Sequence, residues 1–196
     1  MDAIQTAFAD PVHQAQQVFR RVLDAMARPG RIHTLRDLPQ AAPGLSRAAT
    51  AVCLTLTDFE TPFWLDGAAG AARNYLVFHC SAPIVAHPEQ AAFAVVGDAA
   101  ALNDFYRFNL GSDECPETSC TLIVEVTDLN NGGERRLAGP GIRYTASLDV
   151  AGVADSFWQQ LEDNHALFPR GLDLILTCGD RIAALPRSVR LLERGN

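Results

Sequence analysis

The amino-acid sequence predicts an α/β fold: a single domain over residues 1–196, with a mixed central sheet of about seven strands flanked by helices. Two observations support this prediction. Candidate helices alternate with short strands in the first half of the chain, whereas strand-turn-strand patterns follow in the second half. The length of 196 residues, with 48% hydrophobic and 20% charged residues, suits one globular domain with a sizeable core.

The first predicted element is an amphipathic helix in DPVHQAQQVFRRVLDAMARPG, residues 10–30. It opens with an aspartate cap and a first-turn proline, carries apolar residues at helical spacing, and ends at a Pro-Gly pair. Residues 31–35, RIHTL, then alternate polar and apolar side chains as a short strand does. Residues 45–58, LSRAATAVCLTLTD, suit a helix or a strand by periodicity alone, and we expect a helix.

The middle of the chain continues this alternation. We expect a strand in TPFWLD (61–66), a helix in AARNYLVFHC (71–80), a strand in AAFAVV (91–96) and a helix in AALNDFYRF (100–108). Next, TLIVEVTDL and RRLAGPGI are joined by NNGGE, whose Asn and Gly residues favour a tight turn, so residues 121–142 predict a hairpin.

The last elements are a helix around VADSFWQQLEDN and a strand pair in FPRGLDLILTCGDRIAALPRS, residues 168–188. Leu172, Leu174 and Leu176 share one face of the first strand of this pair, and the other face is also largely apolar. A strand that is apolar on both faces belongs inside the sheet. The CGD sequence reverses the chain, and Pro186 ends the pairing.

Composition and charge exclude several classes of protein. The net charge of −7 and the absence of a dense basic tract argue against nucleic-acid binding. No apolar run approaches the roughly 20 residues that cross a bilayer, and the N-terminus lacks the pattern of a secretory signal, so we expect a cytoplasmic protein without a membrane partner. The five scattered cysteines suit reduced thiols. Cys115 and Cys120 have no histidine nearby, so we expect no metal site.

The chain contains no lysine, so all 16 basic residues are arginines. This excludes pyridoxal phosphate chemistry through a Schiff base, a Walker A loop and a protein kinase, because each needs a lysine. The sequences GxGxxG, GxSxG, HExxH and CxxC are also missing, so we expect no cofactor.

Five residues are candidates for contacts with a ligand or a partner. Arg20 and Arg21 diverge to the two flanks of the first helix, where they suit a phosphate or carboxylate clamp or are plain solvated arginines. His79 lies beside Cys80, which it would activate as a thiolate in the right geometry, but neighbouring residues of a helix point about 100° apart, so a packing role is favoured. Asp173 enters an apolar strand and needs a donor, and Arg187 follows the next strand within reach of it, either for structure or for binding.

Several of these stretches together resemble the PhnH family of the bacterial carbon-phosphorus lyase system. They occur in family order over residues 19–187, nearly the whole chain. The matching pieces are FRRVLDAM followed by PG, LTLTDFETPFWL, FHCSAP, PEQAAFAV, LAGPGI and FPRGLDLILTCGDRIAALPR.

The resemblance implies a fold similar to the large domain of pyridoxal phosphate-dependent transferases, without that cofactor. It also implies a homodimer that joins the PhnG, PhnI and PhnJ subunits. In that complex a phosphonate displaces adenine from ATP to give a ribose 1-phosphonate 5-triphosphate, and the radical iron-sulfur cleavage belongs to another subunit. Two alternatives stay open: a structural scaffold without a ligand, and a stand-alone transferase that acts on a phosphorylated sugar or nucleotide.

Overall fold

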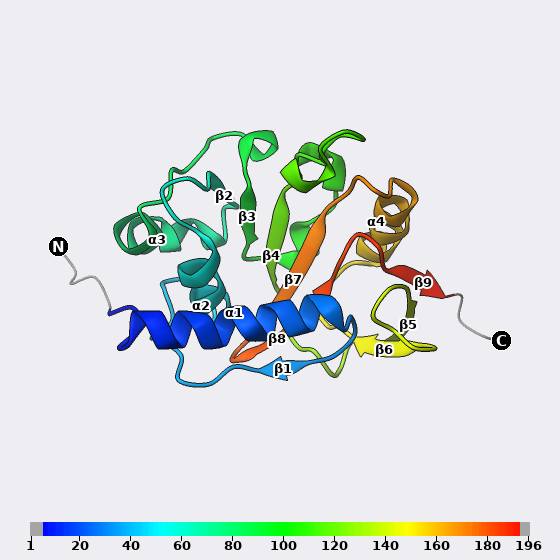
Figure 1. Ribbon diagram of the computed structural model, residues 1–196, viewed down its shortest axis with the longest axis horizontal. Coiled ribbons are helices and arrows are strands. Elements are labelled where there is room, and N and C mark those ends of the chain that lie inside the picture. The colour runs from blue at the N-terminus through cyan, green and yellow to red at the C-terminus, as the bar shows by residue number, and fades with distance from the viewer. Residues whose placement is uncertain (1–5, 193–196) are drawn as a thin grey trace.

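The computed structural model describes residues 6–192, which form helices around two β-sheets. Figure 1 shows α1, α2 and α3 to one side of the main sheet, with α4 and the smaller sheet to the other. The α-helices are α1 (Pro11–Ala27), α2 (Arg47–Leu56), α3 (Arg73–Cys80) and α4 (Asp155–Ala166). Short 3-10 helices are η1 (Ala69–Ala72), η2 (Pro88–Gln90), η3 (Ala99–Ala101), η4 (Phe105–Arg107) and η5 (Pro116–Thr118).

The main sheet has six strands in the order β1-β8-β7-β4-β3-β2. They are β1 (His33–Thr34), β2 (Phe63–Leu65), β3 (Phe93–Val96), β4 (Thr121–Glu125), β7 (Asp173–Cys178) and β8 (Arg181–Leu185). The four strands from β2 to β7 are parallel, whereas β8 and β1 are added antiparallel to their neighbours. The predicted mixed α/β sheet is therefore confirmed, with six strands in place of about seven.

The smaller sheet is antiparallel in the order β6-β5-β9. Its strands are β5 (Glu134–Ala138), β6 (Ala146–Asp149) and β9 (Arg190–Leu192). It closes one face of the main sheet together with α4, whose Phe157 and Leu161 are buried there.

Strand β7 lies inside the main sheet, between β4 and β8, as its pattern predicts. Leu174 and Leu176 pack into the core beside α4, whereas Ile175 packs into the core under α1, α2 and α3. Each fully buried side chain of this size contributes about 1.5 to 3 kcal/mol of transfer free energy. The chain then turns back through Gly179, which has a positive φ of 61°, and β8 ends before Pro186.

The predicted hairpin over residues 121–142 is wrong. Strand β4 is already paired on both edges by β3 and β7, so no edge is available for the segment that follows. That segment forms β5, which pairs with β6 and β9 in the other sheet. The Asn-Gly stretch therefore connects two sheets.

The predicted helix over residues 100–108 is also wrong, because the chain forms two separate 3-10 turns there, η3 and η4. Asp98 and Asp104 each accept a hydrogen bond from the backbone N–H two residues later. Such local side-chain bonds compete with a continuous helix. Residues 45–58, which suited a helix or a strand by periodicity, contain the expected helix, α2. Ser46 caps this helix by accepting a hydrogen bond from the Ala49 N–H.

The five cysteines are unpaired, with Cys115 exposed and Cys120 buried. No helix within residues 6–192 is long and apolar enough to cross a membrane.

Candidate functional site

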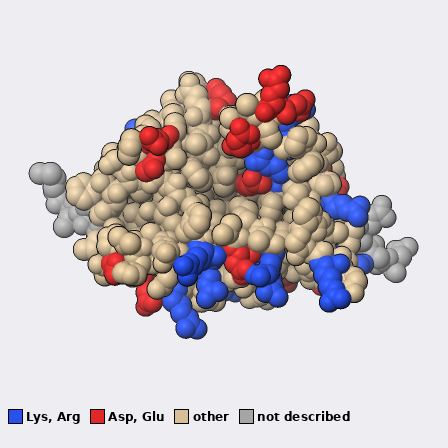
Figure 2. Space-filling view, in the orientation of Figure 1, with Lys and Arg blue, Asp and Glu red and all other residues tan. Residues whose placement is uncertain are grey.

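Helix α1 positions the first two candidate residues. Asp10 caps it by accepting from the His13 backbone N–H at 3.2 Å, and Pro11 occupies the first turn. The buried side of α1 packs against α2 and β8, which leaves Arg20 and Arg21 exposed as predicted. Figure 2 shows a row of basic side chains along α1 and β1, interrupted by a few acidic ones, whereas most of the acidic side chains of this face lie toward the opposite edge.

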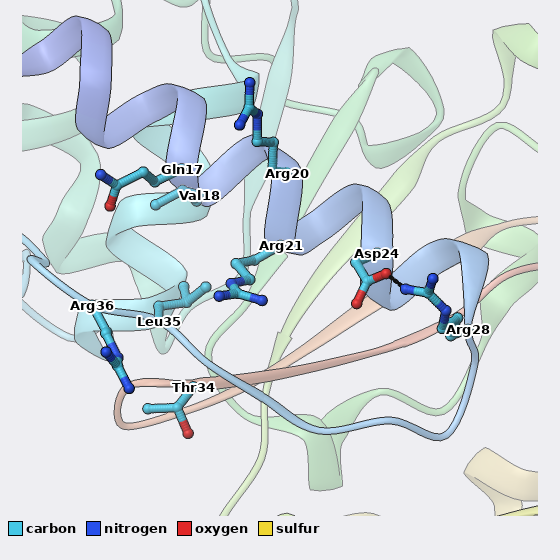
Figure 3. A pocket seen from close by; sticks show the side chains of 9 residues that line it. All are labelled: Gln17, Val18, Arg20, Arg21, Asp24, Arg28, Thr34, Leu35 and Arg36. Carbon is cyan, nitrogen blue, oxygen red and sulfur yellow. Dashed lines mark ion pairs between the residues drawn. The ribbon is translucent and has the colours of Figure 1, made fainter.

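A groove of about 590 Å³ lies between α1 and the chain from Thr34 to Arg36. Its lining residues, drawn in Figure 3, are Gln17, Val18, Arg20, Arg21, Asp24, Arg28, Thr34, Leu35 and Arg36. Val18 and Leu35 are buried and form an apolar floor. Four arginines face a single aspartate, so the lining has a formal excess of three positive charges. We name this site the arginine groove.

The side chains of the arginine groove extend in different directions. Figure 3 shows Arg21 and Arg36 extending into the space below α1, whereas Arg20 projects from the other flank of the helix. Arg28 forms an ion pair with Asp24, one turn earlier on α1. The guanidinium groups along this space can donate planar, permanently charged forks to an anion.

His33 lies behind Asp24 at the edge of the arginine groove. Its Nε2 is 3.5 Å from the Asp24 carboxylate and makes no hydrogen bond within the described chain. Burial lowers the pKa of His33, and the nearby positive charges of Arg21, Arg31 and Arg28 lower it further. The lowered pKa favours the uncharged form of this imidazole beside the groove.

Asp173 and Arg187 form a second arginine-containing site, away from the arginine groove. The Arg187 Nη2 donates to Asp173 Oδ2 at 2.6 Å, and Nε donates to Oδ1 at 3.3 Å. The remaining donors reach the carbonyls of Pro116 and Pro169 and the hydroxyl of Ser119. The predicted reach of Arg187 to this carboxylate is confirmed, and all five N–H donors of the guanidinium are engaged within the chain. We name these residues the Arg187 cluster.

His79, the last candidate, lies on the final turn of α3 and lines neither site. Its ring centroid is 4.4 Å from that of Tyr75 and 4.9 Å from that of Phe78. The neighbouring Cys80 thiol points into the core toward the Cys53 carbonyl, and burial raises its pKa. The thiol is therefore not activated as a nucleophile.

A further hollow of about 370 Å³ lies at the carboxyl ends of β2 and β3, the edge where open α/β sheets commonly bind ligands. Arg107 stacks over Trp64 at 4.9 Å from the ring centroid. The Asp66 carboxylate accepts from the backbone N–H groups of Ala69, Gly97 and Asp98, so it holds the loops of this edge together.

The sequence of this chain matches a known family over most of its length. A family model described as "Bacterial phosphonate metabolism protein (PhnH)" matches residues 6–192, nearly the whole chain. The chain belongs to the PhnH family. The resemblance seen in the sequence is thereby confirmed, and the arginine groove and the Arg187 cluster are features of a PhnH-family protein.

Two relatives have similar length and sequence. The chain is 40% identical, over 94% of both proteins, to "Alpha-D-ribose 1-methylphosphonate 5-triphosphate synthase subunit PhnH" of Rhizobium meliloti (strain 1021). It is 32% identical to "Putative C-P lyase subunit protein HtxG" of Stutzerimonas stutzeri, over 92% of this chain and 87% of that protein. Both relatives are named as subunits.

Sequence reasoning on this PhnH-family chain missed Arg28 and Arg36 as groove residues. A signal for each was present. Gln17, Arg21, Asp24 and Arg28 follow helical spacing and form one polar stripe along α1. Arg36 shares the side of Thr34 by the alternation of an extended chain, with the buried Leu35 between them.

Proposed function

We propose that this chain is a subunit of a carbon-phosphorus lyase core complex, needed for the catabolism of organic phosphonates. It supports the formation of α-D-ribose 1-methylphosphonate 5-triphosphate from ATP and methylphosphonate. The 40% identity to the Rhizobium meliloti synthase subunit, over 94% of both chains, carries this proposal. The role belongs to one cytoplasmic domain over residues 1–196, related in fold to the large domain of pyridoxal phosphate-dependent transferases but without a lysine for that cofactor.

The surface of α1 supports a role in assembly. Phe19 is 50% exposed and Leu23 57% exposed, and with Val12 they form an apolar stripe on the solvent side of the helix. Exposed apolar side chains beside arginines are typical of protein interfaces. We assign this stripe to a subunit contact, either with a second copy in a homodimer or with PhnG, PhnI or PhnJ.

The arginine groove favours a second candidate function, a stand-alone transferase for a phosphorylated sugar or nucleotide. Arginines stabilise charge that develops on phosphate oxygens in such reactions. Turnover of such a substrate by the isolated protein would support it.

Co-expression tests the main proposal. The chain carries an affinity tag and is produced with and without PhnG, PhnI and PhnJ, and ribose 1-methylphosphonate 5-triphosphate is assayed from ATP and methylphosphonate. We expect the tagged chain to retain the three subunits and the product to require it. A chain that stays outside the complex, with undiminished product formation in its absence, would contradict the proposal.

A further inference from the structure

Three arginines of the arginine groove have no acidic partner. Arg20, Arg21 and Arg36 make no ion pair or hydrogen bond within residues 6–192. Elsewhere the same residue type is engaged, as in the ion pairs that Asp155, Asp113 and Asp128 form. The chain has a net charge of −7, yet no carboxylate within residues 6–192 forms an ion pair with these three guanidinium groups. The unpartnered charge is available to an anion from outside.

The groove is elongated because its polar residues follow the helix axis. Gln17, Arg21, Asp24 and Arg28 extend along about 16 Å of α1, at 1.5 Å per residue. Thr34 and Arg36 face them from the other wall. A ligand with several charges in a row would contact Arg21 and Arg36 together, whereas a single phosphate would leave most of the groove unused.

Asp24, the one carboxylate among the described residues of the lining, does not cancel this charge for a bound anion. Asp24 is already paired with Arg28, and the two form a neutral unit at one end of the groove. The remaining donors are three guanidinium groups, the Gln17 amide and the Thr34 hydroxyl. Guanidinium forks form bidentate hydrogen bonds to phosphate oxygens, and amide and hydroxyl groups add further bonds.

We infer that the arginine groove is a binding site for an oligophosphate chain of the triphosphate type, held by Arg21 and Arg36 from opposite walls with Arg20 at the rim. The inference rests on the proposed function for the choice of triphosphate over other polyanions. A concave site of about 590 Å³ has the size of a small-molecule site, which favours a phosphate chain over an acidic segment of a partner.

Calorimetric titration of the purified chain with inorganic tripolyphosphate tests this inference. We expect saturable binding that weakens as salt is raised, and weaker binding of inorganic phosphate. The double variant Arg21→Gln with Arg36→Gln should bind tripolyphosphate at least about tenfold more weakly, because charge-assisted hydrogen bonds are lost on both walls.

The matched control is Arg73→Gln with Arg190→Gln. Both arginines are exposed, neither lines the groove, and the loss of net charge is the same. We expect the control to bind as the wild type does, and the denaturation midpoint of each variant reports whether it is folded. Equal binding by both double variants, or no binding by the wild type at low salt, overturns the inference.

Complex assembly separates this inference from the proposed function. A groove variant that binds tripolyphosphate normally but loses PhnG, PhnI or PhnJ would assign the groove to an acidic partner surface, against our inference. If the wild-type complex forms product but the purified chain does not bind tripolyphosphate, the proposed function stands and only the inference about the groove fails.

Discussion

The arginine groove and the Arg187 cluster use the same residue type in opposite ways. Arg187 donates all five of its N–H groups to Asp173, Ser119 and two backbone carbonyls, with only 14% of its side chain exposed. Arg21 and Arg36 are exposed and have no hydrogen bond within the described chain. An arginine with satisfied donors contributes to folding, whereas one with unsatisfied donors beside a cavity can contribute to binding.

This contrast explains why composition alone does not locate a site in a chain whose basic residues are all arginines. Arg187 connects segments far apart in the sequence, since Pro116 lies before β4 and Asp173 begins β7. Residue type is the same in both regions. The number of internal partners separates them, and that number depends on the fold.

The largest expected effect is on the stability of the Arg187 cluster. Replacing Arg187 with alanine removes every bond of the guanidinium and leaves the Asp173 carboxylate, 25% exposed, without its counter-ion. We expect a loss of about 3 kcal/mol in the free energy of unfolding, measured by urea denaturation. The exposed Arg190→Ala serves as a control and should change stability by less than about 0.5 kcal/mol. If the two variants lost similar amounts of stability, Arg187 would not have the stabilising role that we assign to it.

A smaller effect on stability is expected at Glu125. Its carboxylate is held by neutral hydrogen-bond donors, whereas that of Asp173 is held by an arginine. Glu125 lies at the end of β4 and accepts the N–H of Ser46 at the start of α2. Burial raises its pKa above the ordinary 4.5, although the hydrogen bonds from Ser46 and Thr177 oppose the shift.

The sign of its pH dependence follows from linkage. A raised pKa means that the folded state binds the proton more tightly than the unfolded state. The resulting stabilisation is present below about pH 4.5 and is lost as the pH rises through the folded-state pKa. The stability of the wild type relative to Glu125→Gln should therefore fall with rising pH in that window, measured by denaturation at each pH. A difference that stays constant or rises would show that burial does not dominate.

The smallest effect on stability is expected in the arginine groove. Arg21→Gln with Arg36→Gln removes no internal hydrogen bond, so the free energy of unfolding should change by less than about 0.5 kcal/mol. The same urea titration measures it. A loss above about 1 kcal/mol would mean that these arginines stabilise the fold, and the contrast with the Arg187 cluster would fail.

Local patterns were enough to predict much of the fold. The apolar residues on both faces of β7 predicted a strand inside the sheet, because an exposed face would have required polar alternation. The caps of α1 and the Pro-Gly pair after it predicted the helix ends. The partner of β5 was not predictable in this way, because strand pairing depends on which edges distant segments already occupy.

Part of the candidate site could also be predicted from local patterns, and part could not. Helical spacing placed Arg20 and Arg21 on the flanks of α1, and the chain order placed Arg187 within reach of Asp173. The part played by Arg36 depends on the chain turning back along α1 after Gly30, which has a positive φ of 85°. A Cβ there would approach the Ala146 Cβ to 2.9 Å, so this reversal requires glycine and depends on packing against β6.

Within the part of the chain that the structure describes, the residues that line the arginine groove all lie from Gln17 to Arg36. One continuous stretch of helix, turn and strand therefore forms the anion-binding surface that we propose. The elements that support this stretch come from elsewhere in the chain. Substitutions at its exposed arginines can alter ligand preference without disturbing the core, whereas its buried residues, such as Val18 and Leu35, pack against the sheet. Ligand preference and structural framework thus depend on different side chains of the same stretch, and relatives can diverge in the first while they preserve the second.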